Sequence, residues 1–307
     1  MSATTLLIYG GSGSGKTSQL GKLIEEVFIT TGKKSRIYSG DFGGSDTIAP
    51  YVELDMVDLI EIGTSDPWIF LNKAVRGFIR DDKGKWVKDE KSNANLGVVA
   101  FESAHGIAQL LKNDMSAQAA KGVTIGGDAN SSFSIKGDGE DLKIGSVKGF
   151  QQYAIPQQQI LTSMYESFRL PAQYVVWTAG VDVGTEEASK ARVIGPLVIG
   201  GALTPLLPKD FNYTFHIEVP PAQAGKAPRH VLHLGSHLDQ NAGNTAALGN
   251  SRRPLDASEL KAWTVEPADL VQALKIVRLD AKQEAKQKIQ ARLDAAKAKA
   301  KATLGTK

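Results

Sequence analysis

Residues 4–17 read TTLLIYGGSGSGKT, an apolar run followed at once by a glycine-rich turn. Between Gly10 and Thr17 the chain matches G-x-x-x-x-G-K-[ST] at every fixed position. Glycines can adopt positive φ and leave room beside the backbone, so consecutive N–H groups can surround a phosphate. The stretch therefore predicts a buried strand, a phosphate-binding loop and a helix, in that order.

The loop also carries the side chains that a nucleoside triphosphate needs. Lys16 can bridge the β- and γ-phosphates, and the hydroxyl of Thr17 can hold Mg²⁺. The helix that starts near Lys16 directs the positive end of its dipole at the same anion. We therefore expect ATP and Mg²⁺ as ligands, bound by Gly10, Gly11, Ser12, Gly13, Ser14, Gly15, Lys16 and Thr17.

The sequence after the loop alternates between helix and strand patterns. Apolar residues recur at helical spacing from Thr17 to Gly32, which is placed to end a helix, and residues 35–39 form the next strand. Further strands are expected at residues 57–62, 96–101 and 174–178, with late antiparallel strands at 213–219 and 229–234. Helices are expected from Pro67 through Phe78, through residues 110–111, and at residues 157–168. Repeated strand–helix–strand units predict an α/β fold with a mostly parallel sheet flanked by helices.

Composition excludes several classes of protein. The chain of 307 residues contains no cysteine, which excludes disulfide frameworks, thiolate zinc sites, iron–sulfur clusters and cysteine nucleophiles. No run of 18 or more apolar residues occurs, so no membrane partner is expected. The first residues lack a basic segment ahead of their apolar stretch, which argues against a signal peptide. These features indicate a soluble, cytoplasmic protein.

Charge is distributed unevenly along the chain. The formal net charge is +3, but residues 275–307 carry ten basic and three acidic side chains, which leaves −4 on the rest. After Pro267 no glycine or proline occurs until beyond residue 303, which predicts one long helix rich in Ala and Lys. We therefore divide the chain into a core (1–240), a linker (241–266) and a basic helical tail (267–307).

A narrow apolar stripe follows this tail at spacings of three and four: Leu270, Leu274, Val277, Ala281, Ala285, Ile289 and Leu293. Such a stripe can dock on the core, pair with another chain, or lie against nucleic acid together with the lysines. A solvated helix with one weakly packed face fits the pattern equally well. All four interpretations stay open.

Hydrolysis of ATP requires more than the phosphate loop. Glu102 ends an apolar strand, where parallel sheets bind their ligands, and can support Mg²⁺; alternatively it is a surface acid that begins a helix. Asp41 follows the second strand and can orient the attacking water, or it can only favour the turn at residues 43–44. Thr178 can sense the γ-phosphate if its strand neighbours the first one, although a threonine is ordinary at a strand end. The candidate catalytic residues are Lys16, Asp41, Glu102 and Thr178, and the candidate metal-site residues are Thr17 and Glu102.

With these motifs the sequence resembles the RecA-like ATPase core, and it is particularly similar to small phage-encoded ATP-binding proteins of single-strand annealing and recombination. The resemblance covers about residues 3–235 and is carried by residues 10–17, 39–44, 101–103, 175–179 and 195–208. It implies a RecA-like fold and gives Asp41 the place of the catalytic carboxylate. Glu102, where Asp is typical, and a sensor strand without histidine are departures from the family pattern.

RecA-like ATPases usually assemble as rings or filaments, so the resemblance implies a homo-oligomer. In such assemblies a basic residue of one subunit reaches the neighbour's γ-phosphate. Lys190 and Arg192 are placed for this role, with Arg229, Arg252 and Arg253 as rivals. A surface residue in a polar loop is the commoner explanation for each of them.

The resemblance also makes residues 121–149 a candidate loop for single-stranded DNA. The side chains suited to phosphate pairing and base stacking are Lys121, Lys136, Lys143, Lys148 and Phe133. Acidic residues of the same segment oppose such binding: Asp128, Asp138, Glu140 and Asp141. A mobile loop without a ligand fits the composition as well.

Four of the five histidines lie between residues 216 and 237. His230, His233 and His237 suggest a metal site, but residues 230 and 233 of one strand point to opposite faces. No acid or cysteine beyond Asp239 completes a ligand set. The sequence therefore does not predict a metal site there.

Together these patterns lead to one expected function and three alternatives. We expect an oligomeric, Mg²⁺-dependent ATPase coupled to DNA recombination or replication, phage-encoded and acting in the host cytoplasm on single-stranded DNA or a DNA-processing complex. A DNA-packaging or other virion-associated motor shares the site, but no nuclease half is recognisable. A small-molecule or nucleotide kinase uses the same loop but needs a lid with arginines. The last alternative is a nucleotide-binding structural protein that does not turn over.

Overall fold

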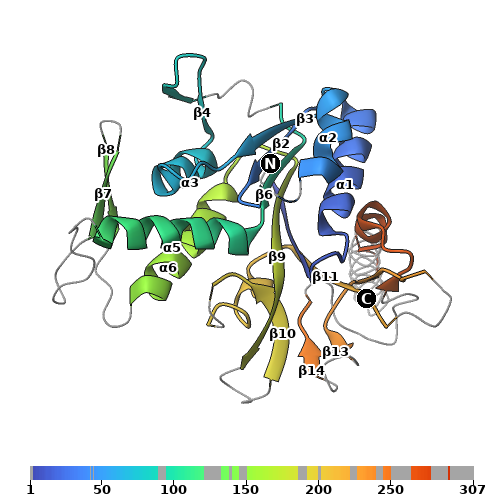
Figure 1. Cartoon of the computed structure of the whole chain (residues 1–307). Helices are drawn as coiled ribbons and strands as arrows, with labels where there is room; N and C mark the ends of the chain where they lie inside the picture. The colour runs from blue at the N-terminus through green and yellow to red at the C-terminus, as the bar shows by residue number, and fades with distance from the viewer. Residues whose placement is uncertain are drawn as a thin grey trace, which may run out of the picture.

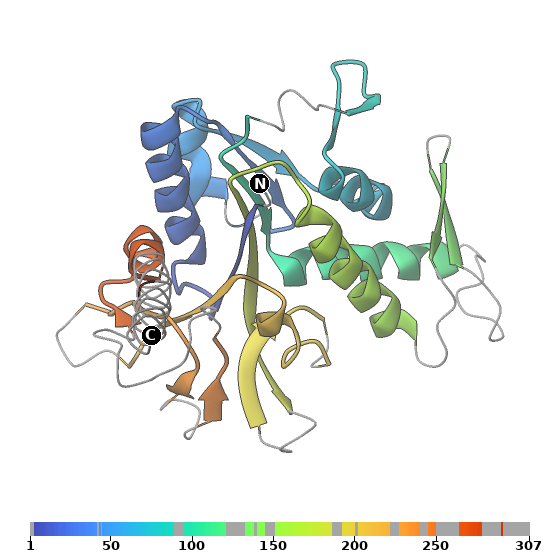
Figure 2. The same ribbon diagram turned by 180° about the vertical axis from the view of Figure 1, so that it is seen from behind.

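The computed structural model of the chain (Figure 1) describes residues 3–41, 43, 45–88, 95–120, 133–137, 140–144, 151–185, 192–199, 202–221, 227–239, 245–249, 264–277 and 290. A central sheet runs through this part of the molecule, and helices cover both of its faces, as Figure 2 shows from behind. None of the helices in these ranges is long and apolar enough to cross a lipid bilayer.

In the described part of the chain, six parallel strands form the middle of the sheet: β1 (Thr4–Gly10), β2 (Ser35–Ser39), β3 (Val57–Glu61), β6 (Val98–Glu102), β9 (Tyr174–Thr185) and β11 (Tyr213–Glu218). Their order across the sheet is β3-β2-β6-β9-β1-β11. Most of these strands are buried apolar runs, because helices cover both faces of such a sheet. The predicted α/β class, with a mostly parallel sheet flanked by helices, is confirmed.

The helices form one group on each face of the sheet. One face carries α1 (Lys16–Thr31) and α2 (Ser45–Glu53), and the other carries α3 (Pro67–Val75), α5 (Ala104–Ala120) and α6 (Gln151–Ser167) (Figures 1 and 2). Because successive side chains of β1 point to opposite faces, this strand contributes to the apolar core on each face of the sheet. Leu6 and Ile8 pack with α1, whereas Leu7 and Tyr9 belong to the core that contains α3, α5 and α6.

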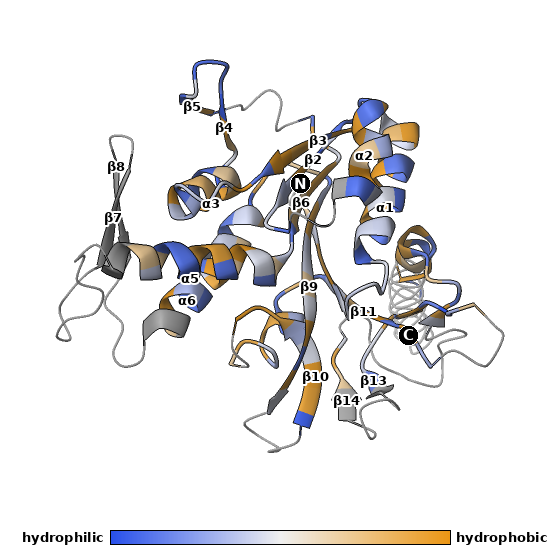
Figure 3. Ribbon diagram, in the orientation of Figure 1, coloured by the Kyte–Doolittle hydropathy of each residue, from blue (hydrophilic) through white to orange (hydrophobic). Residues whose placement is uncertain are grey.

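An extension of five strands, most of them antiparallel to their neighbours, continues the sheet in the described part of the chain. Its strands are β10 (Arg192–Leu197), β12 (Val231–His233), β13 (His237–Asp239), β14 (Thr245–Ala247) and β15 (Thr264–Val265), and a short 3₁₀ helix, η1 (Leu207–Lys209), precedes β11. The strand β10, hydrophobic along most of its length in Figure 3, pairs with the end of β9. The strand β11 is antiparallel to β12 but parallel to β1, so the expectation that it is simply an antiparallel strand is corrected.

The helix predicted to reach Phe78 ends at Val75. Gly77 follows in the left-handed conformation, with φ 81°, which ends the helix early. Phe78 therefore begins a hairpin of β4 (Phe78–Arg80) and β5 (Trp86–Lys88). The helix α2 is absent from our sequence predictions, because Pro50 lies inside it and glycines precede it.

The segment 121–149, expected to be a loop, contains a second hairpin. Its strands β7 (Phe133–Gly137) and β8 (Glu140–Ile144) pair antiparallel, with Phe133 opposite Ile144 and Ile135 opposite Leu142. These four residues alternate with polar ones, which is the pattern of a strand with two different faces. The hairpin lies at the far end of α5 from β6 (Figure 1).

The segment 241–266, expected to be a linker, contributes strands to the same sheet. The strand β14 pairs with β10, and β15 pairs with β12, so the described parts of this segment belong to the core. The remaining residues of the segment lie outside the described ranges.

The predicted tail helix is observed at residues 270–277, and Gln290 is also helical; the rest of the tail lies outside the described residues. Leu270, Leu274 and Val277 are buried against the core that contains α1. The side chain of Gln19 joins the two segments: its amide donates to the carbonyl of Ala268 at 2.8 Å, and its oxygen accepts from the N–H of Leu270 at 2.8 Å. The first turns of the tail therefore dock on the core.

Candidate nucleotide-binding site

The loop between β1 and α1 depends on glycine at several positions. Gly13 and Gly15 have φ of 72° and 91°, in the left-handed region that side chains disfavour. At Gly10 an added Cβ atom would lie 2.6 Å from both the carbonyl oxygen of Ile217 and the hydroxyl of Ser14. The backbone conformation of the loop therefore accounts for the glycines at positions 10, 13 and 15.

Lys16 extends from the first turn of α1 back over the loop. Its ammonium group donates hydrogen bonds to the carbonyls of Gly10 and Gly11, both at 2.9 Å. Burial lowers the pKa of Lys16, while the nearby carboxylates of Glu102 and Asp41 act in the opposite direction. The loop carbonyls and these carboxylates together hold the positive charge beside the loop.

Glu102 faces the neighbouring turn of α1. Its side chain is only 4% exposed, and its carboxylate accepts a hydrogen bond from the hydroxyl of Thr17. Burial raises the pKa of Glu102; the Thr17 hydrogen bond lowers it, Asp41 raises it and Lys16 lowers it. A hydroxyl beside a carboxylate is the oxygen donor set that Mg²⁺ prefers, so these residues fit the ion expected from the sequence.

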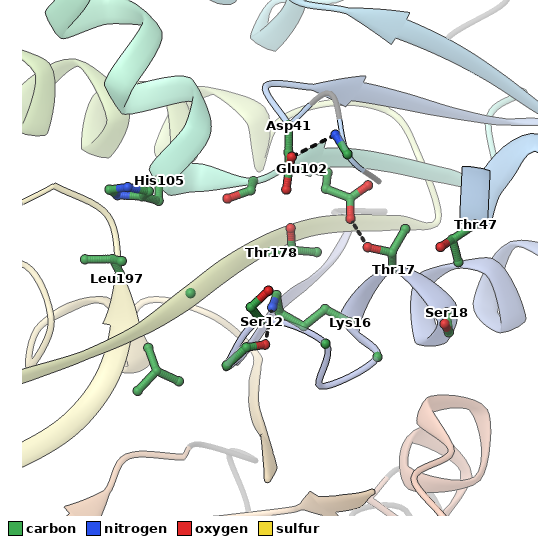
Figure 4. Close-up of a pocket in the computed structure, with 17 residues that line it drawn as sticks. Ser12, Lys16, Thr17, Ser18, Asp41, Thr47, Glu102, His105, Thr178 and Leu197 are labelled. Carbon is green, nitrogen blue, oxygen red and sulfur yellow. Dashed lines mark hydrogen bonds between the residues drawn. The ribbon is translucent and has the colours of Figure 1, made fainter. Parts of the chain in front are cut away.

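Asp41 lies directly after β2 and has an exposed side chain. One of its carboxylate oxygens accepts a hydrogen bond from the N–H of Gly43 at 3.0 Å. Asp41 therefore does stabilise the turn, as one of the two interpretations expected. Asp41 also lines the same pocket as Glu102 (Figure 4). The turn thus presents the carboxylate to the pocket.

Thr178 lies in the strand between β1 and β6, as its expected role requires. Its side chain is completely buried, and its hydroxyl has no hydrogen-bond partner among the described residues. Buried polar groups are normally paired, so an unpaired hydroxyl that lines a pocket indicates a place for a polar ligand.

The topology brings these candidates together. The carboxyl ends of β1, β6 and β2 and the middle of β9 lie beside a cavity of about 620 Å³ (Figure 4). Lys16, Thr17, Asp41, Glu102 and Thr178 all line this cavity. The candidates come from parts of the chain up to 162 residues apart (Lys16 and Thr178), and the sheet order unites them.

Sequence reasoning missed several residues of the cavity. His105, on the first turn of α5, lines it, and its Nδ1 lies 2.7 Å from the carbonyl oxygen of Val198. Thr47 lines it from α2, a helix that the sequence did not predict. His230 contacts the loop from outside, with Nδ1 2.9 Å from the carbonyl oxygen of Ser14. The position of His105, three residues after Glu102, was a usable signal.

Of the basic residues expected to act between subunits, the structure describes Arg192 and Arg229. Arg192 is exposed at the start of β10, and Arg229 pairs with Glu266 at 3.1 Å. Neither lines the cavity within the described residues. Lys136 and Lys143 lie on the β7–β8 hairpin. The other basic candidates lie outside the described ranges: Lys121, Lys148, Lys190, Arg252 and Arg253.

Comparison with known proteins leaves the family open. No family model matches the sequence, and no curated protein matches it. Among solved structures, the chain is similar to a KaiC-like protein from the hyperthermophilic archaeon Pyrococcus horikoshii OT3. The two share 8% sequence identity, the match covers 80% of this chain and 89% of that one, and the TM-score is 0.40. The chain is thus described by its fold and by its candidate site: an α/β P-loop protein.

Proposed function

We propose that this chain binds ATP with Mg²⁺ and hydrolyses it. The observation that carries the proposal is the hydrogen bond between Thr17, at the end of the phosphate loop, and Glu102, at the end of β6. It joins the loop that would hold the triphosphate to a buried carboxylate that would hold the metal.

Binding of the triphosphate is assigned to the backbone of the loop. The N–H groups of residues 11–16 and the start of α1 supply partial positive charge, and the ammonium of Lys16 adds a full one. The oxygens of Thr17 and Glu102 would hold Mg²⁺, directly or through water. The bound metal would neutralise the negative charge that develops on the phosphates.

Hydrolysis is assigned to the groups on the far side of the cavity. Asp41 would accept a hydrogen bond from a water molecule and orient its oxygen towards the γ-phosphorus. That oxygen would form the new bond to phosphorus while its proton passes to the Asp41 carboxylate; the bond to the β–γ bridging oxygen breaks, and ADP leaves with the electron pair. The unpaired hydroxyl of Thr178 would contact the γ-phosphate.

A finer proposal concerns the partner. We propose that hydrolysis is coupled to DNA, in phage recombination or replication, through a homo-oligomeric ring or filament. The basic residues from Lys275 onward support this proposal, whereas the two lysines of the β7–β8 hairpin are balanced by Glu140 and Asp141. A packaging motor and a kinase share the same loop, so the assay must separate them.

The test measures phosphate release with and without single-stranded DNA, for the wild-type chain and for Lys16→Ala. We expect turnover to fall about 100-fold or more in the variant, the usual cost of losing a group that stabilises the transition state. Lys33→Ala, which removes a lysine just beyond α1, is the matched control and should retain turnover. Full activity in Lys16→Ala contradicts the site. Transfer to an added acceptor favours the kinase, and turnover unaffected by DNA contradicts the finer proposal.

A further inference from the structure

Three histidines and a glutamate from β11, β12 and β13 converge. His216 lies on β11 and is the register partner of His233 on β12. Glu218 follows two residues after His216, on the same face of the strand. His237 begins β13, four residues after His233. Strand alternation and one short turn therefore bring the four side chains together.

The atoms that can bind a metal face one another. The Nδ1 atom of His216 lies 3.2 Å from Nε2 of His237. The Nε2 atom of His233 lies 2.9 Å from the Glu218 carboxylate, and Nε2 of His237 lies 3.9 Å from the same oxygen. Ligand atoms of the three histidines are all within 4.8 Å of one another. Ligands about 2.0–2.1 Å from a tetrahedral zinc ion lie roughly 3.3 Å apart, so these separations bracket the required geometry.

Neighbouring groups contact these rings. The ring of Tyr9 stacks on His216 with centroids 4.7 Å apart. The rings of His233 and His237 lie parallel with centroids 3.4 Å apart, so one of them must rotate about its side-chain torsions for both nitrogens to bind the same ion. Nδ1 of His237 lies 3.4 Å from the carbonyl oxygen of Gly235, the kind of outer partner that orients a metal-binding imidazole.

We propose that His216, His233, His237 and Glu218 form a binding site for a divalent transition-metal ion of the zinc type, separate from the ATP–Mg²⁺ site. Imidazole nitrogen suits zinc, copper, nickel and cobalt, whereas Mg²⁺ prefers oxygen, so the two sites select different ions. Four protein ligands fill a tetrahedral shell, which is the arrangement of a structural site.

The position of this site indicates which strands a bound ion would hold together. It would tie β12 and β13 to β11, the strand beside β1. His230, directly before β12, contacts the carbonyl of Ser14 in the phosphate loop. The ion would thereby stabilise the segment that supports this loop from outside.

The test uses the full chain without an affinity tag, freed of metal by a chelator and dialysed. Co²⁺ is added in the presence of excess Mg²⁺, and the visible absorption of tetrahedral, nitrogen-bound Co²⁺ is recorded. Competition with Zn²⁺ gives the affinity for zinc. We expect one Co²⁺ per chain, displaced by one Zn²⁺, and a higher melting temperature with Zn²⁺.

Two variants separate the site from adventitious binding. His237→Gln and Glu218→Gln change half-buried side chains, and each should weaken binding by more than the roughly 10–100-fold that loss of an outer partner costs. His105→Gln, which removes a histidine outside the cluster, should bind Co²⁺ as the wild type does. Absence of binding by the folded wild type, or binding that survives both cluster variants, overturns the proposal. Circular dichroism of the metal-free variants confirms that each is folded.

Discussion

The hydroxyl of Thr17 donates a hydrogen bond to the carboxylate of Glu102, across 85 residues of sequence. This contact joins the first turn of α1 to the end of β6, two strands away from β1 in the sheet. It places an oxygen donor from each side of the cavity where a cation would neutralise phosphate charge.

Replacing Glu102 by Gln should preserve ATP binding but reduce turnover about 100-fold, because the amide keeps the volume and loses the charge that would support Mg²⁺. The Mg²⁺ concentration that gives half-maximal turnover should also rise. Turnover and the half-maximal Mg²⁺ concentration are both obtained from steady-state assays at varied Mg²⁺. Glu61→Gln, at the exposed end of β3, is the control and should behave as the wild type. Equal Mg²⁺ requirements in the two variants would contradict the assignment of Glu102.

Asp41→Asn separates the two roles of this residue. The amide oxygen can still accept the hydrogen bond from the N–H of Gly43, so the turn and the melting temperature should be retained. The carboxylate that would orient water is lost, so turnover should fall by about 10²–10⁴-fold, the usual contribution of such a group. Thermal unfolding and single-turnover hydrolysis provide the two readouts. Unchanged turnover would show that Asp41 only shapes the turn.

Thr178→Val should change stability and activity in opposite directions. The hydroxyl is buried and has no partner in the described part of the chain, so replacing it by a methyl group should raise the free energy of unfolding by up to about 1 kcal/mol. Turnover should fall, because the contact to the γ-phosphate is lost. Urea unfolding without nucleotide and an ATPase assay test both parts. A less stable but fully active variant is the outcome that argues against a sensing role.

Gly10 and Gly11 form a matched pair. An alanine Cβ at Gly10 would lie 2.6 Å from the Ile217 carbonyl oxygen, whereas a Cβ at Gly11 would have no described atom within 4 Å beyond its own chain neighbours. Gly10→Ala should therefore lower the free energy of unfolding by about 1–3 kcal/mol, and Gly11→Ala by much less. Parallel urea titrations measure both values. Equal stability of the two variants would contradict the packing described around β11.

The sequence predicted those parts of the site whose geometry is local. The loop from Gly10 to Thr17 is readable because positive φ at Gly13 and Gly15 needs glycine, and Gly32 ends α1 as its position indicates. The contact between Thr17 and Glu102 required the order of β1, β9 and β6, which depends on packing between distant segments. Local spacing carries no information on that order.

The histidine cluster likewise depends on pairing between strands, which local spacing does not predict. The expectation that residues 230 and 233 face apart is consistent with the structure, because His230 contacts Ser14 while His233 contacts Glu218. The proposed ligand set includes His216, which the antiparallel register of β11 and β12 brings opposite His233, and Glu218, whose register partner is Val231. That register could not be read from either strand alone.

The bonds from Gln19 to Ala268 and Leu270 have a mechanical consequence. Gln19 lies two residues after Thr17, in the opening turns of the helix whose first residues are Lys16 and Thr17. A displacement of the C-terminal segment would therefore act directly on the helix whose first residues would hold the triphosphate. The first turns of the tail are thus joined by hydrogen bonds to the helix that follows the phosphate loop.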